Sequence, residues 1–326
     1  MHPQARIFVA GGDTLIGAAI VRALQRTGHA AVLHPSTEEQ PLTSAAVVEE
    51  LFRRHEPEYV FVAAGRSGGI EANRRHPADL MIDNLLVGTH VCTAAWRHGV
   101  TKLLYLASSC CYPRECEQPM QVGHLGTGPL EPTSEPYATA KLAGIQLCRA
   151  LRRQHGTAFI TAIPADVFGP GSSFDGEHSH VIPALITKMH AAKIAGAPWI
   201  ELWGSGAPRR EFLFAEDLAD ACLVAMDRYD AEVPINLGGG TELSIRDAAT
   251  MIAEVVGYHG EIRFDASRPD GMPRKLLDSG VLFGLGWRPA TAFRDALETT
   301  YRSFLDGLPA AGRRYPSSSD SPAVKP

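Results

Sequence analysis

The sequence predicts an α/β protein built on a doubly wound parallel sheet, with a smaller C-terminal α/β lobe. Two observations in the first half of the chain predict this fold class: short apolar runs alternate with helical patterns, and a glycine-bearing turn joins the first run to the first helical pattern. A third observation is that the alternation becomes less regular after Gly171. Such alternation is typical of parallel strands covered by helices on both faces.

The N-terminal half supplies the alternating elements. Residues 6–10 form an apolar run that predicts a strand, and after a turn over residues 11–17 a helical pattern runs from 18 to 26 and ends at Gly28. The same reasoning predicts, in order, strand 30–33, helix 44–55, strand 59–64, helix 78–98, strand 102–107, helix 136–155 and strand 158–164.

The C-terminal half carries fewer regular patterns. It predicts helix 179–192, strands near 199–203 and 211–214, helix 245–256 and a final helix over about 293–304. Ser244 and Asp247 have the spacing of a capping box at the start of helix 245–256. We therefore expect a dinucleotide-binding domain over 1–165, to which the chain returns near 214–238, a mainly substrate-binding lobe over 166–310, and a disordered tail over 311–326.

The composition argues against several classes of protein. The chain has 326 residues, of which 45% are hydrophobic and 21% charged, and its formal net charge of -5 gives no reason to expect a nucleic-acid partner. Its apolar runs are shorter than the roughly 20 residues that span a bilayer. The N-terminus lacks a basic stretch followed by an apolar core. We expect a cytoplasmic protein that binds neither nucleic acid nor membrane.

The six cysteines show neither the spacing of metal ligands nor the density of a disulfide-stapled domain. We expect no metal site and mostly reduced thiols in apolar packing. Cys110 and Cys111 follow the end of strand 102–107. Because adjacent residues of an extended chain point to opposite sides, we expect only one of the two to face a cleft.

The turn over residues 11–17 has features of a dinucleotide-binding turn. Gly11 permits the tight turn and Gly17 permits close packing of the helix, but Thr14 stands where the middle glycine is usual, so a plain strand-to-helix turn is the alternative reading. Asp13 would repel a 2′-phosphate, and the second strand ends in His34 without an arginine. The residues themselves leave the choice between NADP and NAD open.

Tyr137 and Lys141 are four residues apart in the predicted helix 136–155, so their side chains share one face. A nearby ammonium can lower the pKa of a phenol and let it exchange protons near neutral pH. Ser108, at the end of the preceding strand, would hold the carbonyl or hydroxyl of a substrate. The set indicates a redox enzyme, although an amphipathic helix with one exposed lysine gives the same spacing.

Longer strings resemble the extended short-chain dehydrogenase/reductases and, within them closely, the GDP-L-fucose synthases, over about residues 6–306. The strings that carry this resemblance are GGIEAN at 68–73, SSCCYP at 108–113, LEPTSEPYATAK at 130–141, SHVIPA at 179–184, WGSG at 203–206 with REF at 210–212, and PDGMPRKLLD at 269–278. The resemblance implies a Rossmann domain and a homodimer. It also implies an enzyme that epimerises GDP-4-keto-6-deoxy-mannose at C3 and C5 and then reduces C4.

The resemblance also implies roles for individual residues. Ser108, Tyr137 and Lys141 fall on the reductase triad, and Cys110 and His180 fall on the base and acid of the epimerisation. The residues expected at the cofactor are Gly11, Asp13, Thr14, Leu15, Ile16, Gly17, His34, Ala63, Ala64, Lys141, Pro164, Val167 and His180. Those expected at the substrate are Ser109, Asp166, Lys188, Trp203, Arg210, Asp270 and Lys275.

Several residues depart from the family pattern. The resemblance implies NADP(H), whereas Asp13 and the missing basic residues after the second strand keep NAD(H) as an alternative. Asp166 stands where the family generally carries asparagine for sugar contact, and Phe168 stands where tyrosine is common. Replacing an amide by a carboxylate removes two N–H donors and adds charge, so the preferred sugar is open at this stage.

Two other functions fit the same residues. One is an epimerase or dehydratase in which a tightly held NAD oxidises and re-reduces a single substrate, with no net redox change. The other is a sensor or scaffold that binds a dinucleotide without turnover, which the altered glycine pattern would permit. The second is disfavoured because a pure binder would not need the acid, the base and the triad.

Overall fold

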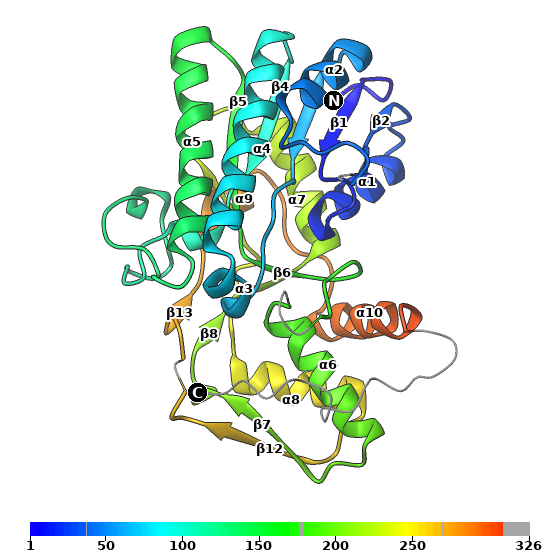
Figure 1. Ribbon diagram of the computed structural model, residues 1–326, viewed down its shortest axis with the longest axis vertical. Helices are drawn as coiled ribbons and strands as arrows, with labels where there is room; N and C mark the ends of the chain where they lie inside the picture. The colour runs from blue at the N-terminus through cyan, green and yellow to red at the C-terminus, as the bar shows by residue number, and fades with distance from the viewer. Residues whose placement is uncertain (37, 176–178, 269, 309–326) are drawn as a thin grey trace.

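A parallel sheet forms the centre of the computed structural model, which describes residues 1–36, 38–175, 179–268 and 270–308 (Figure 1). Within these residues the sheet has six strands in the order β10-β5-β4-β3-β1-β2, and each neighbouring pair runs parallel. The strands are β1 (Ile7–Ala10), β2 (Val32–Leu33), β3 (Tyr59–Val62), β4 (Lys102–Leu106), β5 (Phe159–Pro164) and β10 (Ile235–Leu237). The predicted doubly wound parallel sheet is confirmed.

Two layers of helices pack around this sheet. Helix α1 (Leu15–Arg26) lies against α7 (Ala215–Arg228), while α4 (Pro77–Arg97) lies between α2 (Ala45–His55) and α5 (Glu135–His155). Strands β1, β3, β4 and β5 are buried almost throughout, as expected for strands covered on both faces. Their side chains and those of the covering helices form one continuous apolar core.

The smaller lobe lies beyond one end of the sheet (Figure 1). Its helices α6 (Val181–Ile194), α8 (Ile245–Val256) and α10 (Phe293–Asp306) share a second apolar core. Three small groups of strands complete it: β7 (Trp199–Trp203) with β12 (Glu261–Asp265), β11 (Leu243–Ser244) with β8 (Arg209–Arg210) and β13 (Arg274–Lys275), and β6 (Asp166–Phe168) with β9 (Phe212–Phe214). Further short helices are α3 (Ile70–Arg75), α9 (Gly280–Gly284), η1 (Ser109–Cys111) and η2 (Val122–His124).

Several element boundaries differ from the sequence prediction. Helix α1 begins at Leu15 rather than at 18, because Thr14 is its N-cap. The hydroxyl of Thr14 accepts a hydrogen bond from the N–H of Gly17 at 3.1 Å, so Gly17 lies inside the helix. Helix α3 was not predicted, since its six residues are too few for a clear pattern. Helix α7 and strand β10 were not predicted as separate elements either, and β10 extends the central sheet beside β5.

Helix α8 has the predicted bounds and the predicted cap. The hydroxyl of Ser244 accepts from the N–H of Asp247 at 3.0 Å and donates to its carboxylate at 2.6 Å. The predicted disordered tail, residues 311–326, lies outside the described residues. In the described part of the chain, no helix is both long enough and apolar enough to cross a bilayer.

Candidate active site

The turn between β1 and α1 is closely packed. Gly11 has a φ of +81°, and a Cβ at this position would lie 2.6 Å from the Cα of Ala64. A Cβ on Gly17 would lie 1.9 Å from the carbonyl oxygen of Gly11. Only glycine therefore fits at either position. At Gly11 the backbone of the turn packs directly against the backbone that follows β3.

This turn fits a dinucleotide. The start of α1 offers backbone N–H groups to a pyrophosphate, and Leu15 and Ile16 lie in its first turn. Asp13 and His34 are exposed beside the turn, and a Cβ on Gly12 would lie 2.4 Å from the Cβ of His34. The other residues predicted at the cofactor lie at or just after strand ends or in the smaller lobe: Ala63, Ala64, Pro164 and Val167.

Strand β4 ends beside the predicted triad. Ser108 caps the short helix η1, and its hydroxyl accepts a hydrogen bond from the N–H of Cys110 at 3.2 Å. Burial and the neighbouring Cys110 raise the pKa of Tyr137, whereas a hydrogen bond to Ser108 opposes the rise. The structure thus brings Ser108, Cys110 and Tyr137 together.

Lys141 lies one helical turn after Tyr137 on the same face of α5, as the spacing predicted. Its ammonium is 6.0 Å from the centre of the Tyr137 ring and 5.4 Å from that of Tyr105, and it donates a hydrogen bond to the carbonyl oxygen of Leu106 at 3.3 Å. Burial lowers the pKa of Lys141 to about 8. The expected lowering of the pKa of Tyr137 by this ammonium is not found, because burial dominates and raises it.

The two adjacent cysteines lie in the helical turn η1 and not in extended chain, so the reasoning from strand alternation was wrong. Cys111 is fully buried, and its thiol donates to the carbonyl oxygen of Ala138 at 3.6 Å. Burial raises the pKa of Cys111 to about 12. Cys110 is half-buried and lies within electrostatic range of Lys275 and Arg210, where it opposes the lowering of the pKa of both cations by burial.

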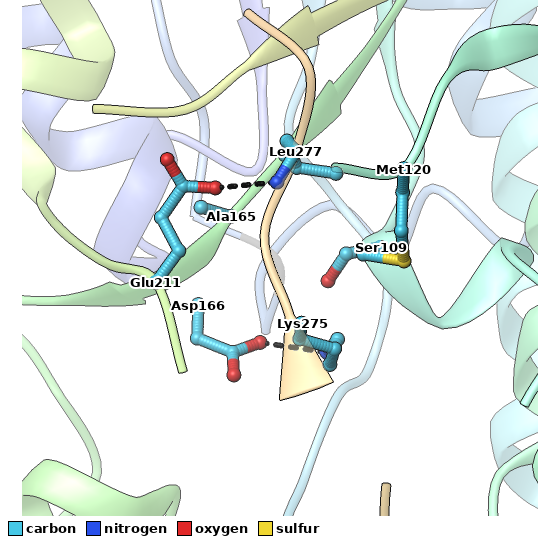
Figure 2. A pocket seen from close by; sticks show the side chains of 7 residues that line it. All are labelled: Ser109, Met120, Ala165, Asp166, Glu211, Lys275 and Leu277. Atoms are coloured by element: carbon cyan, nitrogen blue, oxygen red, sulfur yellow. Dashed lines mark hydrogen bonds and ion pairs between the residues drawn. The ribbon is translucent and has the colours of Figure 1, made fainter. Parts of the chain in front are cut away.

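A small pocket lies beside these residues (Figure 2). The ammonium of Lys275 donates to the carboxylate of Asp166 at 2.9 Å, and the guanidinium of Arg210 is 4.0 Å from the same carboxylate. Burial alone would raise the pKa of Asp166, but Lys275 and Arg210 together hold it below its ordinary value. The lining residues are Ser109, Met120, Ala165, Asp166, Glu211, Lys275 and Leu277.

His180 precedes the first residue of α6 and is exposed. The atoms around its ring nevertheless lower its pKa by excluding water, while Asp166 opposes this shift and Lys275 adds to it. The histidine therefore lies within electrostatic range of the Asp166–Lys275 pair.

Three other residues predicted at the substrate lie around β7, outside the lining of this pocket. Lys188 is exposed and donates to the carbonyl oxygen of Glu201. Trp203 is 66% exposed, with the guanidinium of Arg268 5.1 Å from the centre of its ring. Asp270 accepts from the N–H of Ser205 at 2.7 Å.

The sequence reasoning assigned no role to Glu211, although it lies in the pocket lining (Figure 2). Only 2% of the residue is exposed, and its carboxylate accepts from the N–H of Gly240 at 2.7 Å and of Leu277 at 2.9 Å. Burial raises the pKa of Glu211 to about 7 despite these hydrogen bonds. The sequence signal that could have identified Glu211 was an acidic residue between an arginine and an apolar strand.

Comparison with known proteins adds a family and relatives. Residues 7–238 match the NAD dependent epimerase/dehydratase family. The chain is 47% identical over 305 residues to GDP-L-fucose synthase 1 of Arabidopsis thaliana, covering 94% of both proteins. A GDP-6-OMe-4-keto-L-xylo-heptose reductase from C. jejuni matches with 30% identity and a TM-score of 0.87, over 93% of this chain and 98% of that one. A GDP-L-fucose synthetase from Naegleria fowleri bound to NADP matches with 27% identity and a TM-score of 0.85, over 94% of this chain and 95% of that one.

Proposed function

The chain belongs to the NAD dependent epimerase/dehydratase family and, within it, to the GDP-L-fucose synthases, and from this premise we propose that it converts GDP-4-keto-6-deoxy-D-mannose to GDP-L-fucose. It does so as an NADP(H)-dependent 3,5-epimerase and 4-ketoreductase. The observation that carries the proposal is the meeting of Ser108, Cys110 and Tyr137 at the end of β4, beside a pocket that Lys275 lines and whose Asp166 carboxylate Arg210 approaches.

The epimerisation needs a base and an acid on opposite sides of the sugar ring. The 4-keto group acidifies the protons at C3 and C5, so the Cys110 thiolate removes a proton and leaves an enolate whose oxygen is held by Tyr137 and Ser108. His180 returns a proton to the other face. Cys110 and His180 both lie within electrostatic range of Lys275, which is consistent with one sugar lying between them.

The reduction uses the same contacts to the C4 oxygen. The hydride for C4 would come from bound NADPH. Tyr137 donates the proton to the C4 oxygen, and Ser108 keeps that oxygen in place. Lys141, fixed by the carbonyl of Leu106, is the residue that would hold the nicotinamide ribose and favour proton transfer through Tyr137.

Two cationic side chains suit the charged part of the substrate. Arg210 and Lys275 both lie beside the carboxylate of Asp166, and each is a cation that can pair with the diphosphate of a nucleotide sugar. Lys188, Trp203 and Asp270 around β7 are proposed to contact the nucleotide side of the same substrate.

The proposal includes a homodimer in the cytoplasm. Ile82 and Leu86 lie four residues apart on α4, 52% and 36% exposed, and a second copy of the chain would cover them. The six cysteines are free thiols, which fits a reducing compartment.

Incubation of the purified protein with GDP-4-keto-6-deoxy-D-mannose and NADPH tests the proposed function. We expect a fall in absorbance at 340 nm and GDP-L-fucose as the product. Exchange of solvent deuterium into C3 or C5 without any oxidation of NADPH would instead identify an epimerase with no net redox change. The absence of both would reject the proposal.

A further inference from the structure

Glu211 connects the strands that carry the predicted substrate-binding residues. It lies between Arg210, the last residue of β8, and Phe212, the first of β9. Its N–H donates to the carbonyl oxygen of Lys275 at 3.1 Å, and its own carbonyl oxygen accepts from the N–H of Asp166 at 3.1 Å. The main chain of one residue therefore joins both members of the Asp166–Lys275 ion pair.

The side chain of Glu211 binds two further segments. One carboxylate oxygen accepts from Gly240, in the loop after β10, and the other accepts from Leu277, two residues after Lys275. A Cβ on Gly238 would lie 2.5 Å from this carboxylate, so the loop approaches it as closely as only glycine permits. The segment of residues 275–277 is also bound by Met120, whose N–H donates to the carbonyl oxygen of Leu276 at 2.7 Å.

Burying the charged carboxylate of Glu211 costs free energy of folding, so its presence here is not explained by a gain in stability. The carboxylate is almost completely buried, and the negative charge of Asp166 repels it, so ionisation of Glu211 opposes folding. A neutral side chain of the same size would avoid this cost. What only the ionised carboxylate can do here is accept from Gly240 and Leu277 at the same time.

We propose that Glu211 is a positioning residue for substrate binding, whose carboxylate fixes the segment of residues 275–277 and thereby sets Lys275 and its ion pair with Asp166 where the nucleotide sugar meets them (Figure 2). The inference rests on the proposed function, because the substrate is the one that Lys275 and Arg210 are proposed to bind. Glu211 does not itself touch the substrate in this account.

Glu211→Gln tests the inference, since the amide keeps the size of the side chain but has only one acceptor oxygen. We expect the KM for GDP-4-keto-6-deoxy-D-mannose to rise about tenfold at pH 8, with kcat changed less than about threefold and the KM for NADPH unchanged. We also expect the variant to be at least as stable as the wild type at pH 8, because the opposing charge is gone.

Asp217→Asn is the matched control. Asp217 is another buried carboxylate, 4% exposed, and it accepts from the N–H groups of Ala290 and Thr291, both at 3.2 Å, which lie outside the segment 275–277. The control should lose stability without a change in the KM for the sugar nucleotide. A Glu211→Gln variant that behaves like this control would overturn the positioning role.

A double variant separates positioning from a direct contact with the substrate. In a Lys275→Met background, Glu211→Gln should raise the KM no further, because the group that it positions is already gone. An additional tenfold rise would contradict the inference. Glu211→Asp, which keeps the charge, serves if the amide variant does not fold, and an unchanged KM and pH profile in that shorter variant would count against the inference.

The pH dependence supplies an independent readout. As the pH falls through about 7, Glu211 takes up a proton and loses an acceptor, so kcat/KM of the wild type should fall more steeply than that of Glu211→Gln. The charged groups around Glu211 are Asp166, Lys275 and Arg210, and all remain in both proteins. Parallel pH profiles would reject the inference while leaving the proposed function intact; a wild type without turnover and without binding of GDP would reject both.

Discussion

The ammonium of Lys275 donates a hydrogen bond to the carboxylate of Asp166 at 2.9 Å, although the two residues are 109 positions apart in the sequence. Arg210 approaches the same carboxylate at 4.0 Å. Two cations therefore share the carboxylate of Asp166 in a partly buried place, where each can also pair with an anionic ligand. This cluster brings strands β6, β8 and β13 of the smaller lobe together at the pocket beside the triad.

Asp166→Asn should bind the anionic substrate more tightly. Loss of the carboxylate leaves Lys275 and Arg210 without a shared anion, so we expect the KM for the nucleotide sugar to fall roughly threefold at low salt, with a smaller difference at high ionic strength. Steady-state kinetics at two salt concentrations measure this, with Asp230→Asn, whose carboxylate pairs with Arg152, as the control. A KM that rises would show that the carboxylate itself binds the sugar.

Lys141→Met should stabilise the protein and stop the reduction. The pKa of Lys141 is lowered from 10.5 to about 8, so the buried ammonium opposes folding below about pH 8, and the wild type gains stability as the pH rises from about 8 toward 10.5. At pH 7 the variant should gain about 2 kcal/mol in the free energy of unfolding and lose at least about a hundredfold in kcat. Urea unfolding at pH 7 and pH 10 is the check, and an equal gain at both would contradict the assignment.

Tyr105→Phe should stabilise the protein by about 1 kcal/mol. Tyr105 is 1% exposed, and its hydroxyl has no hydrogen-bond partner among the described residues. Tyr112→Phe is the opposite case, because the hydroxyl of Tyr112 donates to Asn236 at 2.6 Å in the same core, and this variant should lose about 1 kcal/mol or more. Thermal unfolding of both variants would show shifts of opposite sign, and two losses would disprove the interpretation of Tyr105.

Asp13→Arg should increase the preference for NADPH over NADH. Asp13 is exposed beside the turn that precedes α1, where its charge repels a 2′-phosphate and an arginine would attract one. We expect the ratio of kcat/KM for NADPH to that for NADH to rise about tenfold, through the KM for NADPH. An unchanged ratio would mean that Asp13 lies too far from the ribose to act on it.

The sequence predicted the parts of the fold that depend on local pattern. Apolar runs marked the central strands from β1 to β5, and the pair Ser244 and Asp247 marked the start of α8 at the correct residue. The two-residue strands β8, β11 and β13 have no pattern of their own, because their pairing depends on segments far apart in the chain. They became visible only in the folded protein.

The candidate site was predictable to a similar extent. The spacing of Tyr137 and Lys141 on one face of α5 could be read from the sequence, and so could the proximity of Tyr137 to Ser108. The direction of the pKa shift of Tyr137 could not, because it depends on burial by the rest of the fold. Glu211 was also missed, since its hydrogen-bond partners Gly240 and Leu277 are separated from it in the sequence by several helices and strands.

The most direct test of the central claim is to run the reaction in D₂O with NADPH and to count deuterium atoms in the product for each NADPH oxidised. Wild type should give GDP-L-fucose with one deuterium at C3 and one at C5 for each NADPH. Cys110→Ser should slow the incorporation at C3 while cofactor binding is kept, and Tyr137→Phe should abolish NADPH oxidation. A reduced sugar without deuterium at C3 and C5, or full incorporation in Cys110→Ser at the wild-type rate, would contradict the claim that this one site performs both steps.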